Sequence, residues 1–369
     1  MRYARFYRTT LTKQAFVFTS LFAASGLTLS EEPETPTWDV SAPSYSAEVQ
    51  EIELSVTEGT WMNLDVSPDG QHIAFDLLGD IYQIPITGGE ATPLLSGHAW
   101  EIQPQYSPDG RFLAFTSDRN GADNIWVMDL TNPDNKHQIT HESFRLLNNP
   151  SWHPSGEYLV AKKHFTTSRS LGTGEVWLYD ANVDQALTRG NLQGSVLVKR
   201  PSPAFQKELG EPTFSADGES VFYIQNTTPG NTFIYHQDSN GEVMAIKRYD
   251  LETGEIEKVV GGAGGAVRPT PSPDGKTLAF VKRVRAASRL FVMDLASGEQ
   301  TMLVDDLDPD MQETWAVQGA YPTMAWTPDG DSIVYWSQGH IWRVDVASGE
   351  SRQIPFSVND TRTAYPAVE

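Results

Sequence analysis

Histidine and the acidic residues are the side chains of this 369-residue sequence that could hold a metal ion or move a proton. Among its eight histidines, His137 and His141 stand four residues apart, the spacing of paired metal ligands on a helix. The surrounding residues NKHQITHESF read as strand and loop, so these imidazoles are not expected to share a metal. The acidic run DDLDPD at 305–310 lacks the spacing of a calcium loop. The sequence therefore predicts neither a metal nor a cofactor in this chain.

Motifs for nucleophilic or phosphate chemistry are missing as well. No G-x-S-x-G elbow and no G-x-x-x-x-G-K-[ST] phosphate loop occurs, and the run GGAGGAVRP reads as a connection between two strand units. The absence of cysteine excludes disulfides, thiolate metal ligands and a cysteine nucleophile. We predict no catalytic constellation in this chain.

The charge balance restricts the class of partner. With 27 Lys and Arg against 48 Asp and Glu, the formal net charge is −21. Phosphate backbones are bound by Lys and Arg, so this balance argues against a nucleic-acid partner. A protein or peptide partner remains open.

A sequence motif is repeated six times along the chain. Each copy runs through a turn of the type SPDG into an alternating strand, as in YSPDGRFLAFTS (106–117). The spacings between turn glycines are 40, 46, 62, 57 and 55 residues, which indicate propeller blades. In the turn, proline presets φ, aspartate bonds the local backbone, and glycine adopts φ > 0. The turn glycines are Gly70, Gly110, Gly156, Gly218, Gly275 and Gly330.

These repeats predict an all-β protein, a six-bladed β-propeller of four-stranded antiparallel blades over residues 51–356. A third strand recurs in each unit, as in NIWVMDL and RLFVMDL, and helical periodicity is missing after the first thirty residues. We expect EIELSV (51–56) to close the ring beside SRQIPF (351–356), so that no sheet edge stays exposed.

A ring of polar residues is the first candidate site. Seven positions before each turn glycine, one residue opens the innermost strand of its blade and is expected at the channel mouth. Two interpretations stay open: a water-filled channel with a polar lining, or a site for a peptide or small polar ligand. The six residues are Asn63, Gln103, Asn149, Glu211, Arg268 and Thr323.

A rim of cations is the second candidate site. Loops between the second and third strands of a blade lie on one face, and three of them carry Lys and Arg. We predict that this rim recognises an anionic group, with scattered solubilising charges as the alternative. The eight residues are Arg119, Lys162, Lys163, Arg169, Lys282, Arg283, Arg285 and Arg289.

Residues 1–30 have the layout of a signal peptide. Arg2, Arg5, Arg8 and Lys13 precede the apolar run AFVFTSLFAASGLTL, and no acidic residue comes before Glu31. Residues 31–50 read as a flexible linker rich in Pro, Ser and Glu, and 357–369 as a C-terminal tail. We therefore expect a periplasmic or secreted protein with no membrane span after cleavage.

The phrases SPDG…IAF and TSDRNG…NIW resemble the repeats of TolB-like propellers. Longer phrases, among them GGAGGAVRPTPSPDGK and DMQETWAVQGAYPTMAWTPDG, resemble the N-terminal propeller region of exported bacterial amidohydrolases. In that family a metal-dependent hydrolase barrel follows the propeller. None of the positions that match the family's metal ligands lies in this chain, so no catalytic residue is carried over.

Three functions remain open at this stage. The first is a noncatalytic binding or docking module, the N-terminal propeller portion of an amidohydrolase-type protein. The second is part of a metal-dependent amidohydrolase whose catalytic barrel is missing from this chain, and any divalent metal would belong to that barrel. The third is a stand-alone TolB-like scaffold for protein interactions. Propellers reuse one frame for unrelated tasks, so the repeats cannot choose among them.

Overall fold

The computed structural model describes residues 40, 49–168, 171–182, 190, 192–235, 237–238 and 240–364. All of them lie in one compact unit, Trp38–Glu369. The signal peptide and nearly all of the linker expected from the sequence fall outside the described residues. No helix among the described residues is long and apolar enough to cross a membrane.

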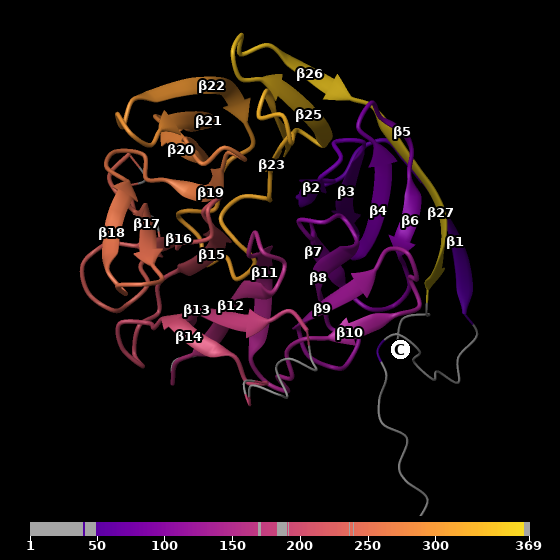
Figure 1. The fold of residues 1–369 in the computed structure, drawn as a ribbon, viewed down its shortest axis with the longest axis horizontal. Coiled ribbons are helices and arrows are strands. Elements are labelled where there is room, and N and C mark those ends of the chain that lie inside the picture. The colour runs from indigo at the N-terminus through magenta and orange to yellow at the C-terminus, as the bar shows by residue number, and fades with distance from the viewer. Residues whose placement is uncertain are drawn as a thin grey trace, which may run out of the picture. The chain divides into compact units, whose positions relative to one another are not determined.

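Six four-stranded antiparallel sheets stand around a common axis, which confirms the predicted propeller (Figure 1). In every blade the first strand is innermost and the fourth is outermost (Figure 1). The strands of blades one to three are β2 (Leu64–Val66), β3 (His72–Leu77), β4 (Asp80–Pro85) and β6 (Thr92–Leu95); β7 (Glu101–Tyr106), β8 (Phe112–Ser117), β9 (Asn124–Asp129) and β10 (Lys136–Gln138); β11 (Leu146–Trp152), β12 (Tyr158–Thr166), β13 (Gly172–Asp180) and β14 (Ser195–Val198).

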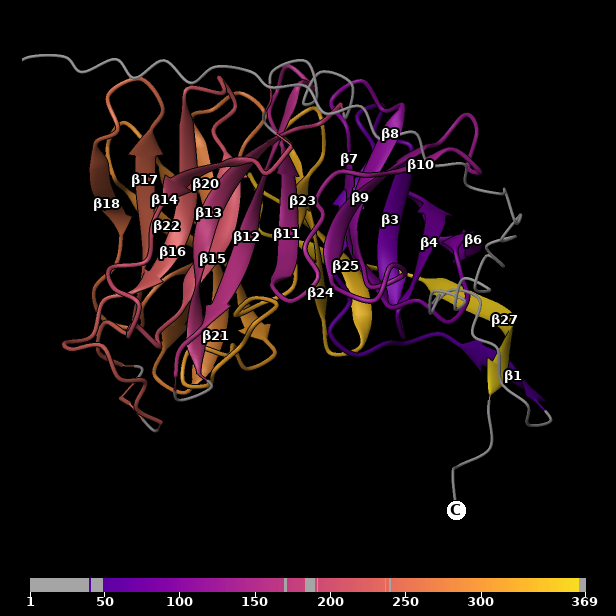
Figure 2. The ribbon, with the colours of Figure 1, turned by 90° about the horizontal axis from the view of Figure 1, so that it is seen from below.

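Blades four to six repeat this order, and Figure 2 shows their strands from the side. Their strands are β15 (Leu209–Phe214), β16 (Ser220–Asn226), β17 (Met244–Asp250) and β18 (Ile256–Val260); β19 (Val267–Pro271), β20 (Thr277–Val284), β21 (Ala287–Asp294) and β22 (Gln300–Leu307); β23 (Ala325–Trp326), β24 (Ser332–Ser337), β25 (His340–Asp345) and β26 (Ser351–Ile354).

The repeated turns adopt the predicted geometry. All six turn glycines have φ between 70° and 76°, a region that side chains with a Cβ rarely enter. In the first turn, the Ser67 hydroxyl donates to the Asp69 carboxylate at 2.6 Å, and the Gly70 N–H donates to the Ser67 carbonyl at 2.8 Å. The turns therefore set the angle between the first two strands of each blade through local bonds.

Apolar side chains fill the spaces between neighbouring blades. Ile81, Leu113 and Phe115 belong to a buried cluster formed by blades one and two. Leu147 and Ile125 belong to another, between blades two and three. The hydrophobic core is therefore distributed around the ring, and the axis is left to polar side chains.

The closure predicted from the sequence is wrong. Gln50–Val56 (β1) pairs antiparallel with Phe356–Ala364 (β27), and not with 351–356, because Ser351–Ile354 already pairs with β25 as the fourth strand of blade six. Residues 357–364, expected as a tail, are therefore a strand. Figures 1 and 2 show β27 running from blade six along the outside of blade one.

Two contacts fasten β27 to blade one. It pairs parallel with β5 (Gly89–Glu90), and its Arg362 guanidinium forms a 2.8 Å ion pair with the buried Asp80. The Tyr82 hydroxyl donates to Asp360 at 2.8 Å. The C-terminal strand thus acts as a strap across the junction of the first and last blades.

Candidate functional site

We call the six predicted ring residues the collar. Four of them lie within the innermost strands of blades two to five, and Asn63 and Thr323 lie just before those of blades one and six. Five of them are buried, and Thr323 is half-buried. In blades two to five the collar residue has positive φ and lies at a bulge between the first two strands. Such backbone strain persists only where surrounding contacts hold it. The four φ values are 60° at Gln103, 54° at Asn149, 49° at Glu211 and 56° at Arg268.

Hydrogen bonds link the collar from blade to blade. The Gln103 side-chain carbonyl accepts the Asn149 N–H at 2.7 Å, and the Asn63 side-chain carbonyl accepts the Thr323 N–H at 3.1 Å. Asp76, on the second strand of blade one, accepts the Gln103 N–H at 2.8 Å. Most polar groups of the collar are therefore occupied by neighbouring blades.

Asp76 was missed by sequence reasoning. Its carboxylate also accepts the Asn63 N–H and side-chain amide, both at 2.8 Å. Burial raises its pKa to about 7, against the lowering effect of these donors. An acid in the otherwise apolar strand HIAFDL is the signal that could have found it.

Glu211 and Arg268 form the ionic part of the collar. One oxygen of the Glu211 carboxylate accepts the Arg268 N–H at 2.5 Å, and the other accepts the Ala320 N–H at 2.5 Å. The Arg268 guanidinium lies 3.2 Å from Glu211 and donates to the Tyr321 carbonyl at 2.7 Å. Both side chains are buried, and each is the counter-charge of the other.

The free space at the collar is small. A cavity of about 50 Å³ is lined by Gln103, Asn149, Glu211, Arg268 and Thr323, among others. A water molecule occupies about 30 Å³ of liquid, so this cavity has the size for one or two waters. A ligand role for the collar itself therefore stays a prediction.

A segment of the long connection between β22 and β23 lies over the collar, and we call residues 315–319 the plug. The Val317 carbonyl accepts Lys162 Nζ at 2.6 Å and the Asn148 side-chain amide at 3.1 Å. The Gln318 carbonyl accepts the side-chain amides of Gln103 at 2.8 Å and Asn149 at 3.3 Å. Four side-chain donors from blades two and three therefore converge on two consecutive main-chain carbonyls.

A buried group of charged and aromatic side chains adjoins the plug. Lys162 Nζ also donates to Glu208 at 2.5 Å, and both side chains are buried. Burial raises the pKa of Glu208, although Lys162 opposes this shift. His164 packs edge-on against Trp315 with ring centroids 5.5 Å apart, and burial lowers its pKa to about 3. Neither ring nitrogen of His164 has a hydrogen-bond partner among the described residues.

Four of the eight predicted rim cations form ion pairs among the described residues. In blades three and five, the second strand ends beside the start of the first strand. The loops that follow β12 and β20 therefore lie on the same face of the propeller. Arg119 forms a close ion pair with Glu101, and Lys163 forms one with Glu142. Lys162 is buried with Glu208, which removes it from the surface.

Blade five contributes the rest of the rim. Arg283 pairs with Asp310 at 2.8 Å and with Glu313 at 2.5 Å. Lys282 donates to Gln300 at 3.5 Å, and Arg289 donates to the Met302 sulfur at 3.2 Å. Arg285 is exposed in the turn after β20. Arg169, in blade three, lies outside the described residues. Recognition of an anion by this rim stays a prediction.

The opposite channel mouth is a funnel of about 350 Å³ between the repeated turns. Asp65 lines it and accepts the Tyr106 N–H at 2.7 Å and the Val66 N–H at 2.9 Å. Burial raises the pKa of Asp65 to about 7. Its carboxylate thus ties the innermost strands of blades one and two together.

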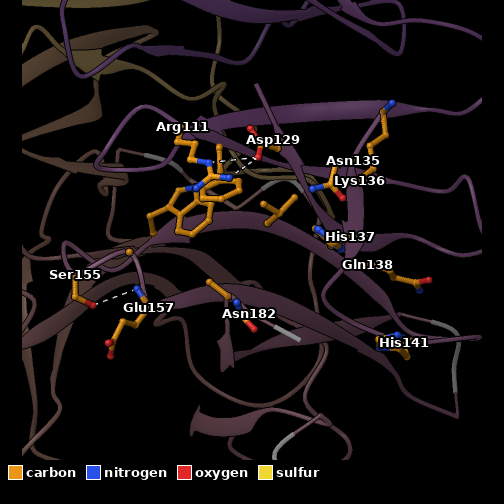
Figure 3. A pocket seen from close by; sticks show the side chains of 15 residues that line it. Arg111, Asp129, Asn135, Lys136, His137, Gln138, His141, Ser155, Glu157 and Asn182 are labelled. Atoms are coloured by element: carbon orange, nitrogen blue, oxygen red, sulfur yellow. Dashed lines mark hydrogen bonds and ion pairs between the residues drawn. The ribbon is translucent and has the colours of Figure 1, made fainter. Parts of the chain in front are cut away.

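A larger cleft of about 730 Å³ opens on the outside, between blades two and three (Figure 3). Arg111 and Asp129 form a 2.8 Å ion pair in it, and this bond lowers the pKa of Asp129 to about 2. His137 and His141 line the same cleft (Figure 3). His137 lies on β10 and His141 in the loop beyond it, as predicted. No group of three His, Asp or Glu side chains placed to hold a metal occurs in the described part of the chain.

A family model described as the TolB beta propeller domain matches residues 45–198, which include blades one to three. Over 305 residues the chain is 24% identical to the Tricorn protease homolog 1 of Streptomyces coelicolor, covering 81% of this chain and 25% of the relative. Over 259 residues it is 25% identical to the dipeptidyl aminopeptidase BIII of Pseudoxanthomonas mexicana, covering 61% and 36%. The chain therefore spans about a quarter to a third of the length of these two curated relatives.

Solved structures share the fold at low identity. TolB from Acinetobacter baumannii superposes with a TM-score of 0.57 and 16% identity, over 82% of this chain and 66% of that one. The tricorn protease superposes with a TM-score of 0.55 and 16% identity, over 80% of this chain and 26% of that one. At such identity the likeness concerns the propeller alone.

Proposed function

This chain is a TolB-like β-propeller, and from that premise we propose that it is an exported, noncatalytic binding module whose ligand is polypeptide. The observation that carries the proposal is the plug. Four side-chain donors hold two consecutive main-chain carbonyls at the channel mouth. A surface that binds main-chain carbonyls through side chains is suited to hold an extended segment of any protein.

We further propose that the module is the N-terminal propeller portion of an amidohydrolase-type protein. The long phrases of the sequence resemble that family, and the curated relatives carry their matching region within much longer chains. In such a protein the catalytic barrel and its divalent metal would lie outside this chain. The stand-alone TolB-like scaffold is the competing function, supported by the likeness to solved TolB structures.

The size of the native protein tests this assignment. Envelope and culture-medium fractions of the source cells are immunoblotted with an antibody raised against residues 51–356. An amidohydrolase-type protein predicts a band much larger than 40.9 kDa, and immunopurified material should hydrolyse amide substrates until a metal chelator is added. A band at or just below 40.9 kDa would contradict the assignment and favour the scaffold. Detection only in the cytoplasm would contradict export.

A further inference from the structure

We propose that the plug stands in for an extended, uncharged segment of a partner protein, and that the socket beneath it binds that segment after the plug swings aside. The socket consists of Gln103, Asn148, Asn149 and Lys162. This inference rests on the proposed polypeptide-binding function and names its site. It also makes the plug an autoinhibitory contact.

The geometry of the socket is specific for main chain. All four donors are side-chain nitrogens, and their acceptors are the carbonyl oxygens of Val317 and Gln318, at 2.6–3.3 Å. A carbonyl is present at every residue of every polypeptide. The contacts therefore do not depend on the side chains of Val317 and Gln318, and another segment on the same path would satisfy the same donors.

The charges around the socket favour a neutral occupant. Lys162 is paired with Glu208 at 2.5 Å, and Arg268 is paired with Glu211 at 3.2 Å. Each of these two cations already has its carboxylate, so neither is free to hold an anion. An extended main chain, which is polar and uncharged, fits this balance better than the anionic group that the sequence suggested.

The plug is attached mainly by polar contacts. Trp315, Ala316 and Val317 are half-buried, and none of them belongs to the buried hydrophobic clusters of the described residues. The Trp315 indole N–H donates to the Gly172 carbonyl at 3.2 Å, and its ring meets His164. Segments with few apolar contacts open at lower free energy than the strands around them.

Gly319 is the plug residue next to the Glu211–Arg268 pair of the collar. Its φ is +119°, and a Cβ there would lie 2.3 Å from the Arg268 Nη2. The substitution Gly319→Ala should therefore push the plug away while leaving the four donors unchanged. We therefore use Gly319→Ala to expose the socket in the binding experiment.

The test is fluorescence anisotropy with the full chain and a labelled peptide of sequence TWAVQGAY (314–321), acetylated and amidated. The intramolecular plug competes with the peptide in the wild type, so the apparent affinity is reduced by the closed fraction. We expect Gly319→Ala to bind the peptide at least tenfold more tightly than the wild type. Lys162→Met, added to Gly319→Ala, should abolish the gain in peptide affinity. Asn148→Ala, added in the same way, should abolish part of that gain.

Two further probes fix the ligand class. A peptide with glycine in place of Val317 should bind within threefold, because the carbonyls are unchanged. A peptide ending in a free carboxylate at Gln318 should bind no better than its amide. Tenfold tighter binding of the carboxylate would overturn the neutral class and support an anion site.

Amide hydrogen exchange completes the test. In the wild type the buried amide of Ala320, which donates to Glu211 at the base of the plug, should exchange at least a hundredfold faster than those of β12. Equal protection would overturn the proposal, because the plug would then be a permanent part of the channel. If Gly319→Ala fails to fold, Trp315→Ala loosens the plug instead, because it removes the indole bond to Gly172 and the ring contact with His164. If exchange shows that the plug opens but no peptide binds, the proposed socket is wrong. That outcome would not affect the assignment tested by the immunoblot for native size.

Discussion

The Glu211 carboxylate accepts the main-chain N–H of Arg268 at 2.5 Å and lies 3.2 Å from the guanidinium of the same residue. The two residues lie on the innermost strands of neighbouring blades, β15 and β19, and are 57 positions apart in the sequence. One side chain thus binds both the backbone and the charge of its neighbour. The interface between blades four and five depends on this pair at its centre.

Glu211→Gln should lower the free energy of unfolding by about 3–5 kcal/mol, because it leaves the buried Arg268 cation without its counter-charge. Urea denaturation followed by tryptophan fluorescence measures the change. The matched control is Glu257→Gln in the exposed 2.5 Å pair with Arg248, where the loss should stay below about 1 kcal/mol. Equal losses in the two variants would contradict a structural role for the collar pair.

Arg362→Ala should destabilise the protein by about 3 kcal/mol at pH 8, because it strips the buried Asp80 of its ion-pair partner. Burial raises the pKa of Asp80 to about 7, and Arg362 opposes that shift. A carboxyl group whose pKa is higher in the folded protein than in the unfolded chain holds its proton more tightly when folded. Its contribution to the free energy of unfolding therefore falls as the pH rises. The penalty of the variant should therefore shrink at pH 5, where Asp80 binds a proton.

Urea denaturation of this variant at pH 5 and pH 8 tests whether the Arg362–Asp80 ion pair fastens β27. The control is Arg352→Ala, on the exposed face of β26. The control should change stability by less than about 0.5 kcal/mol at either pH. A penalty of Arg362→Ala that is equal at both pH values would show that Asp80 does not respond to the loss of the ion pair.

His164→Phe should remove part of the acid sensitivity of the fold. Burial, followed by the positive charges of Lys162, Arg145 and Arg200, lowers the pKa of His164 to about 3, so the folded protein keeps it neutral. The unfolded chain takes up a proton below its ordinary pKa of about 6.5, so stability falls on acidification. The difference between wild type and variant should change by about 1.4 kcal/mol per pH unit between pH 6 and pH 4.

Denaturation curves of both proteins at pH 7.5, 6, 5 and 4 measure that difference. Other buried groups, such as Asp76, contribute equally to both proteins and cancel. Parallel stability curves for wild type and variant would mean that folding does not lower the pKa of His164.

Arg283 and Arg285 belong to the same predicted rim but should respond in opposite directions. Arg283→Ala leaves the buried Asp310 without its guanidinium, which costs about 3 kcal/mol. Arg285 is exposed with φ of +59°, so Arg285→Gly should stabilise the turn by about 1 kcal/mol. Urea midpoints of both variants check this, and a destabilising Arg285→Gly would contradict the assigned strain.

The blades were predictable because their signals are local. The residues of each four-residue turn, most often Pro, Asp and Gly, act locally, and alternation acts within one strand, so the repeats alone locate the strands. Counting seven residues back from each turn glycine also found the collar, including Gln103 and Arg268. The partners of these residues were not predictable, because Glu211 and Arg268 belong to different blades that only the closed ring brings together.

The sequence determined the repeated strand pattern of the blades, the number of blades and the positions of the collar residues, since each can be read from residue types at short, fixed spacings. The tertiary structure alone decided the closure by β1 and β27, the plug and the pairing of the rim. Gln318 meets Gln103 across 215 positions, and Ser55 meets Asn359 across 304. Contacts at such separation depend on how every intervening blade turns about the axis, which no local pattern records.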